Sequence, residues 1–128
     1  MSVKIVRLGS PKTANEGLRI GTVRRPPRGV RKDEYAAKNI YDVWFPNLSP
    51  SEGLLKEAFP VTDSRSWRSF NRRFLTEMKK PEAMKDLDLL AALSHQTNFS
   101  VGCYCEDESR CHRSILRELL ETRGAQIG

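Results

Sequence analysis

A short apolar run at residues 98–103 lies between two segments that carry helical periodicity. The preceding segment begins at Pro81, a residue that suits the first position of a helix, and continues to about residue 95. The following segment runs from about Arg110 to Arg123, and Gly124 stands where a helix C′ residue is expected. A helix, a strand and a second helix in this order favour a parallel sheet, whose ligand sites lie at the carboxyl ends of the strands.

Strand-like segments also occur near the N-terminus. Residues 3–8 and 18–23 alternate well enough to be strands, and residues 24–32 form a basic loop rich in Pro, Arg and Gly. Residues 35–45 are ambiguous between a short helix and an extended run. We therefore expect a single α/β domain over residues 1–128, with a small, mainly parallel sheet flanked by helices in a Rossmann-like three-layer arrangement.

Two further helices are predicted in the middle of the chain. Residues 49–52, with the sequence SPSE, form a helix-start signal in which Ser49 is the cap, and this helix is expected to end at about Phe59, before the proline that follows. Another helix opens at Ser64 or Ser66. Its apolar face carries three aromatic residues at helical spacing, Trp67, Phe70 and Phe74.

The composition places the chain among ordinary globular proteins. Its 128 residues are 38% hydrophobic and 30% charged, which is enough for one core. The apolar runs are far shorter than a membrane span, and the N-terminus lacks a signal-like apolar segment. Three clustered cysteines do not resemble a secreted disulfide framework. These features predict a cytoplasmic protein with no membrane contact.

The positive charge is concentrated in the first third of the chain. Residues 1–40 hold ten Lys or Arg and three Asp or Glu, for a net charge of +7, whereas residues 41–128 hold twelve and thirteen, for −1. A basic region attracts phosphate groups by charge alone, although a solvated basic loop with no anionic partner explains it equally well. Nucleic-acid binding is therefore one open alternative, but no stacking aromatic residues interleave with the basic loop.

The richest chemistry lies in residues 101–114, the Cys/His/Arg motif. All three cysteines fall within nine residues, where a strand is predicted to end and a helix to begin. Backbone N–H groups and the helix dipole at such a place favour anions, including a thiolate. We therefore take four residues as candidate catalytic groups: Cys103, Cys105, Cys111 and His112.

Several interpretations of the sulfurs remain open. One cysteine is a nucleophile, and Cys111 has the helix N-terminus and His112 beside it. Alternatively, the same four residues bind zinc, although adjacent Cys111 and His112 do not follow the usual zinc spacing. The cysteines could instead only pack in the core, or Cys103 could form a redox switch with Cys105 or Cys111. The spacing to Arg110 excludes the C-x5-R loop of cysteine-dependent phosphatases.

The helical projection of the last segment gives His112 and its neighbours provisional directions. His112 lies on the core stripe, Cys111 and Arg113 lie at its margins, and Arg110 points away. A core histidine satisfied by backbone carbonyls is the alternative role for His112. Arginine offers fork-shaped donors for phosphate or carboxylate, so a small anionic ligand is expected. The candidate anion-binding residues are Arg24, Arg28, Arg110 and Arg113.

Several motifs together resemble the domain-of-unknown-function family 488, including its YeaO-like branch. The segment 24–30 is similar to the family's R-x-x-P-R-G-V pattern, and residues 42–51 are similar to its tryptophan and proline-serine segment. Residues 67–77 resemble its aromatic-arginine helix, which ends in a glutamate. Residues 103–114 resemble the C-x-C and C-H-R-S ending found in part of the family.

The resemblance implies a role for eight positions but does not supply a reaction. It adds Glu77 as a supporting residue beside the candidates already named. Val23, Arg25 and Pro26 replace the aspartate, leucine and tryptophan of the YeaO-like pattern. The implied positions are Arg24, Arg28, Glu77, Cys103, Cys105, Cys111, His112 and Arg113. From the residues themselves, we expect a cysteine-dependent enzyme acting on a small anionic, phosphate- or nucleotide-like substrate, or else a nucleic-acid-binding or regulatory module.

Overall fold

The four strands of the computed structural model, which describes residues 1–58 and 61–128, form one sheet with every neighbouring pair parallel. The strand order is β1-β4-β2-β3, so β4 lies inside the sheet between β1 and β2. Val101 of β4 pairs with Ile5 on one side and Ile20 on the other. The strands are β1 Val3–Arg7, β2 Leu18–Gly21, β3 Val43–Trp44 and β4 Phe99–Cys103. The expected parallel sheet is therefore confirmed.

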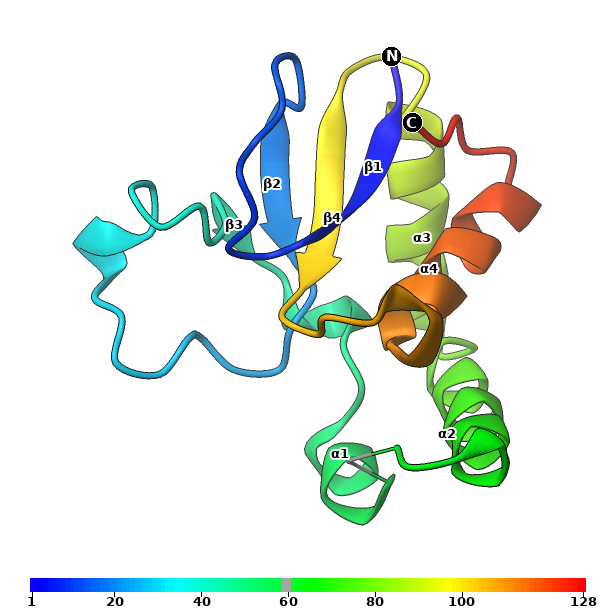
Figure 1. The fold of residues 1–128 in the computed structure, drawn as a ribbon. Helices are drawn as coiled ribbons and strands as arrows, with labels where there is room; N and C mark the ends of the chain where they lie inside the picture. Colours follow the sequence, from blue (N-terminus) through cyan, green and yellow to red (C-terminus); the bar gives the residue numbers. More distant parts are fainter. Residues whose placement is uncertain (59–60) are drawn as a thin grey trace.

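Four α-helices accompany the sheet, and α3 and α4 pack side by side against one of its faces (Figure 1). Helices α1 and α2 contact each other beyond the carboxyl ends of the strands, and α2 also contacts α4. The α-helices are α1 Glu52–Ala58, α2 Ser64–Glu77, α3 Pro81–Leu93 and α4 His112–Thr122. Three short 3-10 helices are η1 Lys32–Glu34, η2 Pro46–Leu48 and η3 Glu108–Arg110. The chain is thus the α/β domain predicted from its sequence.

The main core lies between the sheet and the helices. Alternate residues of β4, Phe99 and Val101, point into it together with Val3 of β1. The helices contribute residues spaced three and four apart, which place one apolar face toward the sheet. Those helical core residues are Phe70, Phe74, Leu87, Leu90, Ala91, Ile115, Leu116 and Leu120.

Connecting segments cover the other face of the sheet. Residues 9–17 and 30–42 pass over it, and a buried ion pair anchors them. Arg19 donates from Nε to Glu16 at 2.7 Å, and each side chain is 1% exposed. Arg19 also donates to the carbonyl oxygens of Ser10 and Asn39, both at 2.8 Å. Ser100 Oγ of β4 donates to the same Glu16 carboxylate at 2.8 Å, which ties these segments to the middle of the sheet.

The start of α1 differs from the prediction. Ser49 is not its cap, because Ser49 is buried and its Oγ donates to the carbonyl oxygen of Pro46, closing η2. Ser51 Oγ instead accepts from Leu54 N at 3.1 Å, so the helix begins two residues later than expected. The predicted end of this helix at Phe59, before Pro60, falls outside the described residues.

Helix α2 begins at Ser64, one of the two predicted starts, and Asp63 caps it by accepting from Ser66 N at 2.7 Å. The start of α4 shifts. Helix α4 begins at His112 rather than near Arg110, because residues 108–110 form the separate turn η3. Cys111 is consequently the N-cap of α4, in extended conformation, rather than part of its first turn. None of the described helices has the length and apolarity needed to cross a membrane.

Candidate functional site

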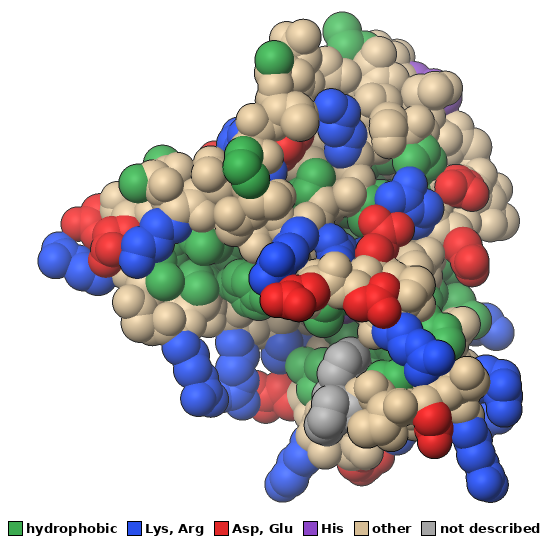
Figure 2. Space-filling view, in the orientation of Figure 1, with side chains coloured by type: hydrophobic (Ala, Val, Ile, Leu, Met, Phe, Trp, Pro, Cys, Tyr) green, Lys and Arg blue, Asp and Glu red, His purple; other side chains and the backbone are tan. Residues whose placement is uncertain are grey.

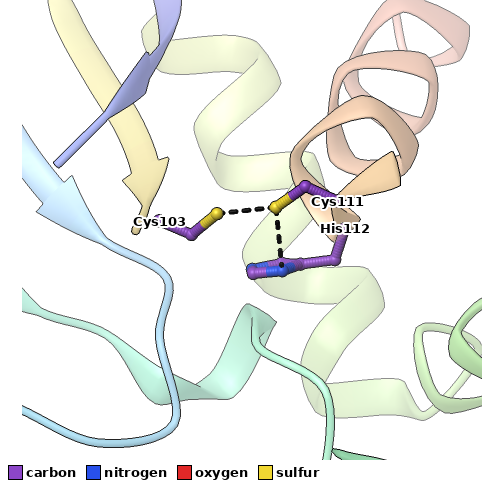
Figure 3. A group of neighbouring side chains, drawn as sticks. All are labelled: Cys103, Cys111 and His112. Carbon is purple, nitrogen blue, oxygen red and sulfur yellow. Dashed lines mark hydrogen bonds between the residues drawn. The ribbon is translucent and has the colours of Figure 1, made fainter. Parts of the chain in front are cut away.

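The sulfur atoms meet where β4 ends and α4 begins. Cys103 is the last residue of β4, and Cys111 is the residue that precedes α4 (Figure 3). Their Sγ atoms lie 2.6 Å apart, and both side chains are buried. Cys105 belongs to the loop between them and interacts electrostatically with both of the other sulfurs. The fold therefore brings all three cysteines into one cluster, with Cys105 the least buried of them.

His112 faces Cys111 in a defined orientation. Its Nε2 donates to the carbonyl oxygen of Thr22 at 2.6 Å, because a carbonyl oxygen can only accept. Nδ1 therefore carries the lone pair, and it lies 3.7 Å from Cys111 Sγ. The ring packs edge-on against Phe74 of α2. Burial disfavours the charged ring and lowers the pKa of His112 to about 4, so the imidazole is neutral near pH 7.

The three thiols differ strongly in acidity. Hydrogen bonds from Cys103 and Cys111 lower the pKa of Cys105 far below its usual range, and His112 and Arg113 act in the same direction. Hydrogen bonding to Cys105 and Cys111 raises the pKa of Cys103, with burial adding to the effect. The hydrogen bond from Cys103 lowers the pKa of Cys111, but the bond to Cys105 and burial outweigh it and raise that pKa to about 11. Within the cluster, the pKa of Cys105 is therefore lowered, whereas the pKa values of Cys103 and Cys111 are raised.

Arg113 places a positive charge beneath the cysteine loop. Its side chain is 3% exposed, and Nη2 donates to the carbonyl oxygen of Cys105 at 2.5 Å. Its Nε is buried without a hydrogen-bond partner. No ion pair joins Arg113 to a carboxylate within residues 1–58 and 61–128. The charge of Arg113 in turn contributes to lowering the pKa of Cys105.

The cysteine cluster opens into a large pocket. Its volume is about 980 Å³, and the basic loop after β2 forms one wall. In Figure 2, Lys and Arg side chains project below this loop, beside an apolar surface. The charged lining residues Arg24, Arg25, Arg28 and Lys56 outnumber Glu52, for a net of four minus one, or +3. The opposite wall consists of Cys103, Tyr104, Cys105 and His112. Basic side chains and the cysteine loop thus line one cavity.

Arg24 and Glu77 hold the rim of this pocket in place. Arg24 donates from Nε to the carbonyl oxygen of Pro50 at 3.0 Å and from Nη2 to that of Ser49 at 3.2 Å. Glu77 of α2 accepts from the backbone N of Ser51 at 2.9 Å and from its hydroxyl. Glu77 thereby fixes the segment whose carbonyl oxygens accept from Arg24.

Other arginines named from the sequence lie elsewhere. Arg110 is absent from the pocket lining and donates to Ser64 Oγ at 3.2 Å, so it joins η3 to α2. The four arginines of α2 are exposed and do not line the pocket, and Arg73 pairs with Glu57. Thr22 could not be identified from the sequence, because it contributes a backbone carbonyl oxygen, which every residue type has. Lys56 and Tyr104 could not be identified either, because only the tertiary contacts bring them to the pocket.

Three of the clustered residues could hold a metal ion. Ligand atoms of Cys103, Cys111 and His112 all lie within 4.8 Å of one another, and all three residues are buried. The donor set suits zinc, which favours thiolate and imidazole. The bond from His112 to Thr22 is also the outer contact that orients a metal-binding histidine. The residues present therefore fit a soft metal, although the acidity of Cys105 needs none.

The chain matches DUF488-N3a, described as the active DUF488-N3 subclade, over residues 3–124. The protein belongs to this family. The match spans nearly the whole domain of this DUF488-N3a member, including the basic loop and the cysteine motif, and it confirms the family resemblance seen in the motifs. No curated protein and no solved structure matches the chain. The activity must therefore be inferred from the site itself.

Proposed function

We propose that this protein is an enzyme that uses Cys105 as a nucleophile on a small anionic substrate. The observation that carries the proposal is the position of Cys105, whose sulfur contacts two thiols and lines the same pocket as Arg24 and Arg28. Cys103 and Cys111 are buried, at 2% and 0% exposure, so a substrate reaches Cys105 more readily. A stabilised thiolate facing an open cavity is the usual form of a reactive cysteine.

The pocket supports an anionic substrate with an apolar body. Its basic residues belong mostly to one loop, whereas Val23, Pro26, Pro27, Leu55 and Tyr104 supply apolar surface. A phosphate or carboxylate would lie against the guanidinium groups, and the less polar part of the substrate would fill the remaining volume. A nucleotide-like molecule has both parts. In this proposal Arg113 stabilises the thiolate from below and His112 orients Cys111.

Alkylation by iodoacetamide tests the nucleophile. At about pH 6 a thiol with the ordinary pKa of about 8.5 is almost fully protonated and reacts slowly. We expect Cys105 to be carboxamidomethylated at that pH, and Cys103 and Cys111 to be spared, as judged by mass mapping of peptides. Cys105→Ser removes the fast modification, whereas Ser109→Ala, in the same loop, retains it. If all three cysteines resist alkylation up to about pH 8, the proposal is wrong.

Protection by an anion tests the substrate class. Inorganic phosphate is expected to slow alkylation of Cys105 when compared with chloride at equal ionic strength, because a phosphate held by the loop shields the sulfur. Arg28→Gln weakens this protection. Arg68→Gln, on exposed α2 and outside the pocket lining, is the matched control and leaves it unchanged. Equal protection in both variants would contradict an anion site at the loop.

The proximity of Cys103, Cys111 and His112 favours a second candidate, a zinc site in which the cysteines serve as ligands. Metal analysis of the purified protein separates the two. The metal site would be favoured if the wild type binds one zinc per chain and if the Cys111→Ser and His112→Ala variants each bind none. Substitution with Co²⁺ supplies a spectroscopic readout, because thiolate ligands give an intense near-ultraviolet charge-transfer band. Metal-free protein that still shows the fast alkylation favours the nucleophile.

A further inference from the structure

The three sulfurs are arranged so that a group attached to one of them is within reach of the others. The Sγ atoms of Cys103 and Cys111 lie 2.6 Å apart, and Cys105, two residues after Cys103, lines the same pocket as Cys103 and interacts electrostatically with both sulfurs. A nucleophilic cysteine that forms a stable adduct needs no neighbouring thiol. Two thiols beside the nucleophile instead permit disulfide exchange within the protein, which removes an attached group without water.

We propose that the cluster is a thiol relay that reduces a small anionic disulfide and ends as a Cys103–Cys111 disulfide. This proposal rests on the proposed function, because Cys105 must attack first. In that step the Cys105 thiolate forms a bond to one sulfur of the substrate, the substrate S–S bond breaks, and one thiolate product leaves. Cys105 is then in a mixed disulfide with the other half of the substrate.

Cys111 is placed to resolve the mixed disulfide. Its Sγ lies 3.7 Å from Nδ1 of His112, the ring nitrogen that carries the lone pair, so this contact orients the Cys111 thiol. Cys111 attacks the Cys105 sulfur, a Cys105–Cys111 disulfide forms, and the second thiolate product leaves and takes up the Cys111 proton. The substrate has gained two electrons, and the protein has lost the same two from Cys105 and Cys111.

Cys103 completes the relay. It contacts Cys111 and attacks that sulfur, which breaks the Cys105–Cys111 bond, forms the Cys103–Cys111 bond and releases Cys105 with its electron pair. The proton of Cys103 passes to solvent. The sulfurs of Cys103 and Cys111 already lie 2.6 Å apart, so the exchange ends on the pair that needs the least movement to form a disulfide. The disulfide ends up buried, and the nucleophile is regenerated in the pocket. An external thiol restores the reduced protein.

The charge of the pocket selects the disulfide. The net lining charge of +3 favours a carboxylate-bearing disulfide over a neutral one, and the apolar walls accept an aromatic or aliphatic body. Dithiobis(nitrobenzoate) is a suitable probe because it is an aromatic disulfide with one carboxylate on each ring. Dithiodipyridine is the matched neutral probe. Arg28→Gln is expected to slow the anionic probe by about fivefold and to leave the neutral one unchanged.

The experiment treats the reduced, chelator-treated full chain with one equivalent of dithiobis(nitrobenzoate). The relay predicts two thionitrobenzoate ions released per reagent, no mass adduct, a Cys103–Cys111 disulfide in the peptide map, and Cys105 still open to alkylation. Cys111→Ser is expected to release one ion and to retain the adduct on Cys105. Cys103→Ser is expected to release two ions but to end with Cys105 blocked, and Ser109→Ala behaves as the wild type.

The experiment gives different results when the relay proposal is wrong and when the proposal of a nucleophilic Cys105 is wrong. If the wild type releases one ion and keeps the adduct on Cys105, the relay is wrong and the reactive Cys105 stands. If Cys105 neither reacts with the probe nor is alkylated, both proposals are wrong. Zinc bound stoichiometrically to Cys103 and Cys111 in the protein as purified would also overturn the relay. The number of ions released by the wild type and the position of its disulfide test the relay even if a cysteine variant fails to fold.

Discussion

Arg113 donates a hydrogen bond to the backbone carbonyl oxygen of Cys105 at 2.5 Å, from a guanidinium that is 3% exposed. The bond fixes the cysteine loop over the start of α4, and the charge lies beneath the sulfur cluster. The hydrogen bonds to Cys103 and Cys111 lower the pKa of Cys105 most, and the charge of Arg113 acts in the same direction. We therefore propose Arg113 as a positioning residue that links the acidity of Cys105 to the fold.

Removing this charge is expected to make Cys105 less acidic. In Arg113→Met, the pH at which alkylation of Cys105 reaches half its maximal rate rises by about one unit or more, because the thiolate loses a nearby positive charge. Alkylation rates measured across a pH series check this. Arg117→Met, one turn later on α4 and paired with Glu108, is the matched control. An equal profile in both variants would show that Arg113 only supports the loop.

Glu77 is expected to act on the pocket through Ser51. Glu77→Gln replaces one acceptor oxygen with an amide donor that faces the Ser51 hydroxyl, which costs about 1–2 kcal/mol of unfolding free energy. The segment bound by Arg24 then loosens, and phosphate protects Cys105 less well. Urea unfolding and the alkylation assay measure the two effects. Glu57→Gln, which removes an exposed pair with Arg73, should change neither by much.

The ion pair on the other face of the sheet is expected to be a major determinant of stability. Arg19→Met leaves the Glu16 carboxylate buried without its partner and is predicted to cost about 3–5 kcal/mol of unfolding free energy. Arg123→Met breaks the more exposed pair with Asp88 and should cost less than about 1 kcal/mol. Urea titration of the two variants compares them directly. A small loss in Arg19→Met would mean that the covering segments are not held by this pair.

Glu16 also predicts how stability changes in acid. Burial alone would raise the pKa of Glu16, but hydrogen bonds from Arg19 and Ser100 outweigh it and lower that pKa to about 2. The unfolded chain has the higher pKa, so the stabilisation is complete above about pH 4.5 and is lost as the pH falls toward 2. In Glu16→Gln this part of the pH dependence disappears. Unfolding free energies measured between about pH 5 and 3 test it, and an unchanged slope in the variant contradicts it.

Much of the fold could be predicted because local sequence patterns indicate its helices and strands. The apolar spacing of residues 81–93 and the apolar run before Cys103 can be read from the sequence. The sequence also shows the glycine that follows α4, and this residue adopts φ +81° in the structure. The starts of α1 and α4 could not be predicted in the same way. Ser49, Ser64 and Asp63 all have capping chemistry, and the choice among nearby caps depends on what the rest of the chain offers each side chain.

The sequence by itself determined that three cysteines, His112 and Arg113 lie close together in the chain where a strand ends and a helix begins. Tertiary structure decided what each of them does. Thr22 fixes the orientation of the His112 ring through a backbone oxygen 90 residues away in the chain, and the loop after β2 brings its arginines to the pocket. Acidity depends on burial and on the charges and donors around a sulfur. Only the folded chain sets these for Cys103, Cys105 and Cys111, and so makes three chemically identical residues unequal.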